Sequence, residues 1–212
     1  RPPFRTVTRV VASGDGQLTV HKTAIDGGVA VEQDGLRLSA STSEWIDAHS
    51  LQTTLLLAAQ RGGQDLDQVF SICQPWLALL RGDASRDGDA WTLSGAHVDS
   101  TWRNAYVADG RCRIVDREWT WREPIALNVV VIRSIHAFLS SLDSSTTRLR
   151  ELRVRSGRRQ IANIAAALGV KLSAKDFSEF IQIESRLQNL AAGHDRRSQM
   201  IGLWWVLIDR PS

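Results

Sequence analysis

The first fifty residues alternate between apolar or β-branched and polar positions, the two-residue period of half-exposed β-strands. This alternation runs from Phe4 to Ile25 on both sides of Ser-Gly-Asp-Gly at 13–16, where glycine allows the positive φ of a tight turn. A second alternating pair, VAVEQ at 29–33 and LRLSAS at 36–41, flanks an Asp-Gly turn signal. These patterns predict four short strands that form one small antiparallel sheet.

The hydrophobic spacing changes to that of helices beyond residue 50. Ser50 is a plausible N-cap for a helix that ends near Gly62. Residues 65–80 have the same spacing, with Pro75 either kinking that helix or dividing it. The near-continuous apolar stretch at 125–142 has the length of a buried helix.

Shorter elements are predicted between these helices. The Gly, Asp and Ser residues of RGDASRDGD at 81–89 indicate a surface loop before an extended stretch, WTLSG, at 91–95. Two short strands, AYV at 105–107 and CRIVD at 112–116, flank Asp-Gly and predict a hairpin.

The last third of the chain is predicted to be helical after a linker at 144–147. Apolar periodicity indicates helices over 158–168 and 174–192, each followed by glycine. Trp204 and Trp205 are adjacent in a short apolar segment, so one is expected to be buried and the other exposed.

Composition fits a globular protein with a sizeable core. The chain has 212 residues, of which 43% are hydrophobic and 23% charged, and this excludes disorder as a whole-chain description. The longest uncharged apolar run, residues 124–132, is too short to span a bilayer. Cys73 and Cys112 lack metal-ligand spacing, which favours two thiols in a reducing cytoplasm over a disulfide. Because the chain starts without Met or a leader, we expect it to be a piece of a longer protein.

Positive charge is concentrated toward the C-terminus. Residues 148–212 contain twelve Lys or Arg against six Asp or Glu. Such a run usually forms the solvated face of a helix, although it could also bind phosphate. No groove-reading motif accompanies it, so the sequence does not favour a nucleic-acid partner.

The residues with the clearest chemical pattern lie between 93 and 119. His97-x-Asp99 is followed by Asn104, and then by Asp116 beyond the predicted hairpin. Phosphoryl transfer needs a carboxylate near the acceptor hydroxyl, and amide and carboxylate oxygens to hold Mg²⁺ against the nucleotide phosphates. The hairpin would bring Asp99, Asn104 and Asp116 to one edge. Glu118 alternates with Asp116 and either lies beside the metal or caps a turn.

This pattern resembles the protein-kinase superfamily. HVDSTWRN at 97–104 matches its H-x-D-x-x-x-x-N catalytic loop, and VDREW at 115–119 resembles the metal-binding segment of the aminoglycoside and choline phosphotransferases. Lys22 stands where the phosphate-contacting lysine of that superfamily would lie. The resemblance implies an α+β fold.

Three regions follow from that kinase-like fold. They are a reduced N-terminal lobe of antiparallel sheet at 1–48, a mainly helical lobe at 49–142 and a helical extension at 143–212, and we expect them to form one continuous domain.

The resemblance also implies a function that uses ATP and Mg²⁺. Asp99 would act on the acceptor hydroxyl and Lys22 would contact phosphate. Asn104, Asp116 and Glu118 would bind the metal. A closer similarity, to the kinase-like region attached to bacterial methyltransferases and glycosyltransferases of surface-polysaccharide assembly, implies a sugar or glycan acceptor and an adjacent transferase domain.

Two departures favour an alternative, a non-catalytic kinase-like module that binds or docks. No G-x-G-x-x-G loop precedes Lys22, and the chain between Lys22 and Leu36 is too short for the helix whose glutamate pairs with that lysine. Lys22 could then be an ordinary sheet lysine, and Asp99 and Asn104 could cap local backbone. His97 is expected to brace the loop rather than act as a base.

The three tryptophans near these motifs have two interpretations. Trp102, Trp119 and Trp121 are expected to pack in the core and loops, and aromatic faces also suit sugar rings.

Overall fold

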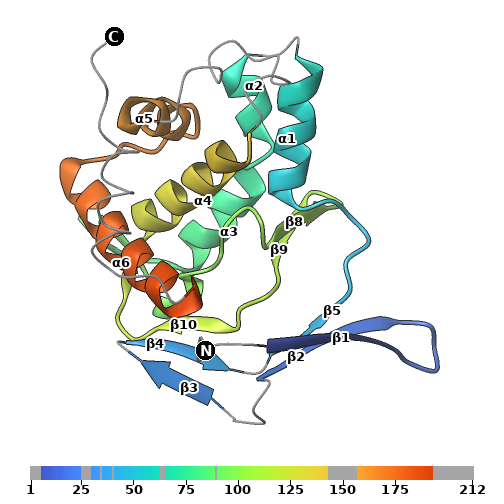
Figure 1. Cartoon of the computed structure of the whole chain (residues 1–212). Coiled ribbons are helices and arrows are strands. Elements are labelled where there is room, and N and C mark those ends of the chain that lie inside the picture. The colour runs from blue at the N-terminus through green and yellow to red at the C-terminus, as the bar shows by residue number, and fades with distance from the viewer. Residues whose placement is uncertain are drawn as a thin grey trace.

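The computed structural model has an α+β architecture, with antiparallel sheets formed mainly by the N-terminal segment and helices forming most of the rest. It describes residues 6–24, 30–33, 35–39, 41–62, 65–88, 90–142 and 157–192. In Figure 1 the helices lie together on one side, above the strands of the N-terminal part. Among the described residues, no helix is both long and apolar enough to cross a membrane. The predicted linker at 144–147 and the Trp204 and Trp205 pair lie outside the described residues.

The first two strands form the hairpin that the alternation predicted. β1 (Thr6–Ala12) pairs antiparallel with β2 (Leu18–Ala24), and Gly16 in the turn has φ of 82°. β5 (Ser41–Glu44) pairs with the other edge of β2, so the sheet order is β1-β2-β5. The fifth strand was not predicted, because Ser-Thr-Ser-Glu lacks the apolar alternation of a half-buried strand.

The second predicted pair belongs to a different sheet. β3 (Ala30–Gln33) and β4 (Leu36–Ser39) form an antiparallel hairpin about Gly35. β4 also pairs with β10 (Trp119–Trp121), giving the order β10-β4-β3. The prediction of one four-stranded sheet is therefore wrong, because a strand from much later in the chain occupies the free edge of β4.

Helices α1 (Leu51–Arg61), α2 (Leu66–Ser71) and α3 (Gln74–Asp83) follow. The Ser50 side chain accepts a hydrogen bond from the backbone N–H of Thr53 in the first turn of α1, as predicted for an N-cap. Pro75 lies in the first turn of α3, where proline fits because its N–H would be unpaired anyway. It divides two helices rather than kinking one.

The segment after α3 contains more strand than predicted. β6 (Ser85–Asp87) and β7 (Ala90–Leu93) form a hairpin, and β7 also pairs with β11 (Ile125–Ala126). The expected surface loop therefore includes a short exposed strand, which a Gly-, Asp- and Ser-rich composition does not indicate.

The segment with the chemical motifs is built on short elements. A 3₁₀ turn, η1 (Gly95–His97), precedes β8 (Ala105–Ala108) and β9 (Arg111–Ile114), which form the predicted hairpin. The predicted buried helix is α4 (Leu127–Ser141), and nine of its residues are buried.

The C-terminal helices join the core of the preceding part. α5 (Arg158–Ala167) and α6 (Ala174–Ala192) agree with the predicted ranges, and Gly169 after α5 has φ of 72°. One hydrophobic cluster runs from Leu36 in β4 to Leu187 in α6. The extension is therefore packed against the helical body.

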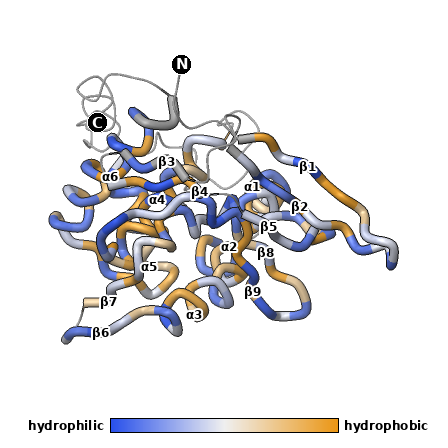
Figure 2. Tube along the Cα trace, turned by 90° about the horizontal axis from the view of Figure 1, so that it is seen from below, coloured by the Kyte–Doolittle hydropathy of each residue, from blue (hydrophilic) through white to orange (hydrophobic). Residues whose placement is uncertain are grey.

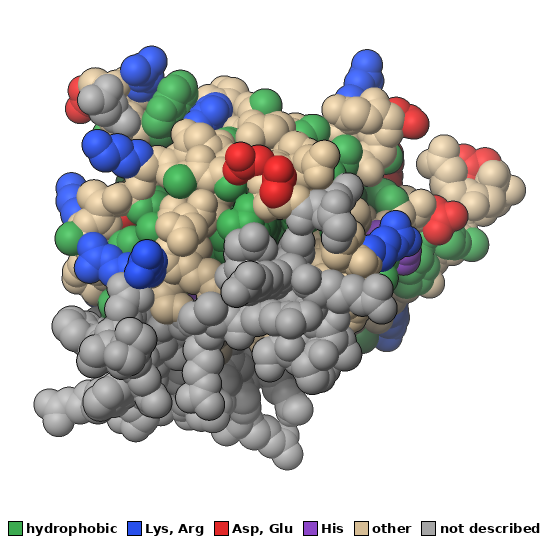
Figure 3. Space-filling model, turned by 90° about the horizontal axis from the view of Figure 1, so that it is seen from above, with side chains coloured by type: hydrophobic (Ala, Val, Ile, Leu, Met, Phe, Trp, Pro, Cys, Tyr) green, Lys and Arg blue, Asp and Glu red, His purple; other side chains and the backbone are tan. Residues whose placement is uncertain are grey.

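Arg158 and Arg159 on α5 are exposed, as expected for a solvated face. In the view of Figure 3, Lys and Arg side chains lie along one side and at separate points of the edge rather than in one continuous patch.

Candidate functional site

The structure brings Lys22 of β2 next to the acidic segment that follows β9. Lys22 Nζ lies 2.5 Å from Asp116 Oδ1 and 3.7 Å from Glu118 Oε1. These residues are distant in sequence, and their side chains are largely shielded from solvent. Lys22 is therefore not an ordinary sheet-surface lysine, because its ammonium group is directed to two of the predicted metal ligands.

Local backbone geometry places these two carboxylates. Asp116 has φ of 63°, in the left-handed region that aspartate adopts more readily than most residues. The Glu118 carbonyl accepts the Ser39 N–H at 2.9 Å, which fixes the segment to β4 just before β10 begins.

The loop that contains Asp99 is held in position by hydrogen bonds with buried side chains. Trp76 Nε1 donates to the Ser100 carbonyl at 2.8 Å. His97 Nδ1 lies 3.1 Å from Ser100 Oγ, and its Nε2 lies 3.5 Å from Asp83 Oδ2. Burial lowers the pKa of His97, Arg117 lowers it further and Asp83 opposes them. These contacts agree with the predicted bracing role.

Asp99 and Asn104 are in direct contact across the loop. Asn104 Nδ2 donates to the Asp99 carbonyl at 3.0 Å and to Asp99 Oδ2 at 2.9 Å. This is the loop-capping interaction given as the structural alternative. Both hydrogen bonds use the amide nitrogen of Asn104 and neither uses its Oδ1, which is the acceptor atom of the side chain.

Two residues that the sequence reasoning did not assign complete the environment of Asp99. Arg133 of α4 places Nη1 3.5 Å from Asp99 Oδ1, and the same nitrogen donates to the Val98 carbonyl. Arg133 Nε also donates to Glu184 Oε2 of α6 at 2.7 Å. Arg133 is the one charged residue in a mainly apolar helix. This sequence feature could have identified it as a site residue, because a buried charge requires a partner.

The group around Asp99 interacts electrostatically with the group around Asp116 and Glu118. Burial raises the pKa of Asp99, Arg133 opposes that rise, and Asp116 and Glu184 add to it. Burial likewise raises the pKa of Glu118, with Asp116 adding to the rise and Lys22 opposing it. Asp99, Asp116, Glu118 and Glu184 outnumber the cations Lys22 and Arg133 among these six residues. The cluster therefore has an excess of negative charge.

The oxygen donors of Asp116 and Glu118 are of the type that Mg²⁺ uses. Glu118 is 7% exposed, and its Oε2 is buried without a hydrogen-bond partner. No group of three His, Cys, Asp or Glu side chains in the described part of the chain is arranged to hold a metal by itself. Mg²⁺ typically uses one or two carboxylates together with substrate phosphates. Asp116 and Glu118 supply the two carboxylates that such a site takes from the protein, and the Lys22 ammonium group lies against both of them in this structure.

The tryptophans near the motifs are mainly packing residues. Trp102 is fully buried, and its ring lies 5.7 Å from those of Phe70 and Trp76. Trp121 is also buried, with the Arg186 guanidinium 5.4 Å from its ring. These two rings have no open face for a sugar, and Trp119 is half-buried.

Gly95 is expected to be irreplaceable at the start of the loop. A Cβ at this position would lie 1.8 Å from the Trp121 carbonyl oxygen, a backbone atom that cannot turn aside as the end of a flexible side chain can. Gly95→Ala should therefore displace β10 and lower the free energy of unfolding by ~3 kcal/mol or more. Urea denaturation measures this, with Gly82→Ala, which meets nothing within 4 Å, as the control. Equal stabilities of the two variants would contradict the close backbone approach.

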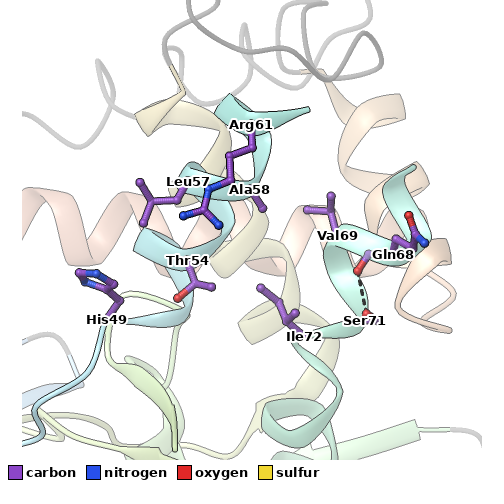
Figure 4. A pocket seen from close by; sticks show the side chains of 9 residues that line it. All are labelled: His49, Thr54, Leu57, Ala58, Arg61, Gln68, Val69, Ser71 and Ile72. Carbon is purple, nitrogen blue, oxygen red and sulfur yellow. Dashed lines mark hydrogen bonds between the residues drawn. The ribbon is translucent and has the colours of Figure 1, made fainter. Parts of the chain in front are cut away.

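A separate hollow lies between α1 and α2, away from the predicted site residues. It has a volume of about 500 Å³, and Figure 4 shows its lining of His49, Thr54, Leu57, Ala58, Arg61, Gln68, Val69, Ser71 and Ile72. The lining includes none of Lys22, Asp99 and Asp116.

The cysteines agree with the prediction of two thiols. Cys73 and Cys112 are both free. Burial raises the pKa of Cys73, and burial raises that of Cys112 to about 11. Neither thiol is activated as a nucleophile.

Comparison with known proteins adds no family assignment. No family model, curated protein or solved structure matches the chain.

Proposed function

We propose that this chain is a kinase-like domain that transfers phosphate from ATP, with Mg²⁺, to a hydroxyl of a sugar or glycan. The observation that supports this most strongly is the convergence of Lys22, from the first sheet, on Asp116, from the segment after the β8–β9 hairpin. Asp99 and Asn104 lie on the loop that precedes the same hairpin. The elements occur in the order expected for a kinase-like catalytic segment.

Each residue has a role that its environment suits. Asp99 orients the acceptor hydroxyl and takes up its proton, because a raised pKa strengthens a carboxylate as a base. Lys22 contacts phosphate. Asn104 Oδ1, Asp116 and Glu118 would hold Mg²⁺, which supplies charge neutralisation on the transferred phosphoryl group. Positioning and electrostatic stabilisation provide the rate enhancement.

An apolar sheet face beside Lys22 suits the nucleotide base. In the β1–β2 register Lys22 is opposite Thr8, and Val20 is opposite Val10, so these four residues share one face. Val10 is 51% exposed and Leu18, two residues before Val20, is 39% exposed. The hydrophobic stretch of β1 is visible in Figure 2. Apolar surface next to a phosphate-binding lysine is the composition expected for a purine site.

The acceptor class and the setting follow from the sequence resemblance. The similarity to regions attached to polysaccharide methyltransferases and glycosyltransferases supports a sugar or glycan acceptor and an adjoining transferase domain. A kinase that uses ATP also fits the cytoplasmic location proposed from the unpaired thiols.

A non-catalytic binding or docking module is the second candidate. The carboxylate partners of Lys22 are Asp116 and Glu118, whereas an active kinase-like site pairs this lysine with a helix-borne glutamate. The β1–β2 turn also contains only Gly14 and Gly16, which fit a plain hairpin turn. These features favour weak binding of a nucleotide.

A thermal-shift titration with MgATP separates the two candidates. A ligand that binds only the folded state adds ~2.7 kcal/mol at 100 times its dissociation constant, or a rise in Tm of roughly 5–10 °C for a domain of this size. We expect that rise for the wild type and its loss in Asp116→Asn. Asp109→Asn is the matched control, because Asp109 is exposed in a left-handed turn position that asparagine tolerates.

Two results would contradict the proposal. Absence of any shift at millimolar MgATP would favour the docking module. A shift of equal size in Asp116→Asn would place the nucleotide elsewhere on the molecule.

A further inference from the structure

We infer that Glu184 of helix α6 is a positioning residue for the catalytic loop and that it acts through Arg133 of α4. This inference deepens the proposed function and rests on it for the role of Asp99. It assigns to the C-terminal extension a part in the active site beyond its packing.

The contacts form a chain from α6 to the loop. Glu184 Oε2 accepts from Arg133 Nε at 2.7 Å. Arg133 Nη1 contacts two consecutive loop residues, donating to the Val98 carbonyl and lying 3.5 Å from Asp99 Oδ1. The guanidinium group is planar, so its Nε–H and Nη1–H bonds have fixed directions relative to one another. The bond from Nε to Glu184 therefore also orients Nη1 toward the loop.

Glu184 is itself held in place. Its second oxygen, Oε1, accepts from Gln188 Nε2 at 2.7 Å, so both carboxylate oxygens are bonded. The side chains of Arg133 and Glu184 are only 11% and 8% exposed. Removing two charges from water is costly unless both are fully paired. The pair is therefore fixed in one geometry, unlike a surface ion pair.

Packing alone does not account for this pair. α4 and α6 also contact each other through the rings of His136 and Phe180, whose centroids are 5.4 Å apart, and both helices contribute buried apolar residues to the same core. A buried ion pair adds little stability compared with apolar residues of similar volume. Arg133 Nη1 points away from α6 to the loop backbone and Asp99. The geometry thus fits a tether, a set of contacts that holds the loop in position, better than a pair whose role is to hold α4 and α6 together.

Three variants and a control test the inference. Glu184→Gln removes one charge, and Arg133→Met with Glu184→Gln removes the whole pair without leaving an unpaired buried charge. Arg133→Lys keeps the charge but loses the planar fork. Glu179→Gln is the control, because it removes the same charge from the same helix, where Glu179 accepts, among the described residues, a single long hydrogen bond, from the Ala126 N–H at 3.4 Å.

The measurements are steady-state kinetics and hydrogen–deuterium exchange of the loop at residues 95–104. For every variant that unfolds cooperatively, we expect loop exchange to be faster by roughly tenfold or more, with helix α3 unchanged. We expect kcat to fall ~100-fold with the KM for ATP unchanged, which is the effect of displacing a catalytic group by about 1 Å. Glu179→Gln should match the wild type in both measurements.

The results separate this inference from the proposed function. Wild-type loop exchange in the double variant, or in Arg133→Lys if the double variant does not fold, would overturn the inference. A double variant with normal kcat would also overturn it and leave the pair a structural one. If the wild type transfers no phosphate but loop exchange responds as expected, the tether is supported and the proposed function is not.

Discussion

Asp99→Asn is expected to lower kcat by ~10²–10⁴-fold, the contribution of a positioned general base. Asparagine keeps an oxygen that can accept the Asn104 amide hydrogen bond, so the loop should retain its shape. It cannot take up the acceptor proton. Transfer of ³²P from ATP to a panel of sugars and glycans, compared at saturating MgATP, measures the loss.

The same substitution should not destabilise the protein. The pKa of Asp99 is raised above 3.8, mainly by burial, so the ionised carboxylate costs folding free energy once the pH exceeds the unfolded-state pKa. Removing the carboxylate should leave Tm unchanged or slightly higher at neutral pH. In the wild type, kcat should fall as the pH drops through the raised pKa, because protonation removes the base.

Asp109→Asn is again the matched control and should leave kcat and its pH dependence unchanged. Full activity in Asp99→Asn would eliminate Asp99 as the base. A large fall in Tm would instead mean that the lost activity reports lost structure.

The local elements of this fold could be read from the sequence because local chemistry determines them. Gly16 and Gly35 take the positive φ values that the two hairpin turns need. Ser50 accepts the Thr53 N–H at the start of α1, as the capping rule predicts. The ends of these elements therefore depend on one or two residues that a reader of the sequence can identify.

The sheet arrangement could not be read in the same way. β4 pairs with β10, and β7 pairs with β11, and both pairings join segments that are far apart in the chain. Strand alternation predicts that a segment is extended but does not specify its partner. The single four-stranded sheet expected at the N-terminus failed for this reason.

The candidate site shows the same division. The spacing of Asp99, Asn104 and Asp116 identified residues that the structure places around one hairpin. The Arg133–Glu184 pair joins two helices whose relative position depends on tertiary packing. A single charge within an apolar stripe is a signal that a buried partner is needed, but it does not identify that partner, and neither residue was predicted to belong to the site.

Truncation after Leu142 is expected to abolish folding, although it leaves Lys22, Asp99 and Asp116 in the chain. It removes α5 and α6, whose buried apolar side chains include Ile161, Ile164, Phe177 and Phe180. Burial of each such side chain stabilises the fold by ~2 kcal/mol. The truncation also exposes apolar surface on α4, and this lowers the free energy of unfolding further. A total on the order of 10 kcal/mol is comparable to the whole stability of a typical domain.

Solubility after expression, circular dichroism and urea denaturation test this expectation. A matched pair of point variants on α6 gives a graded version of the experiment. Phe180→Ala, at a fully buried position, should cost ~3–5 kcal/mol. Lys175→Ala, on the exposed face of the same helix, should change stability by less than ~0.5 kcal/mol. A truncated chain that is soluble and unfolds cooperatively would show that residues 157–192 form a separate module, and Glu184 could not then be required to hold the loop of Asp99.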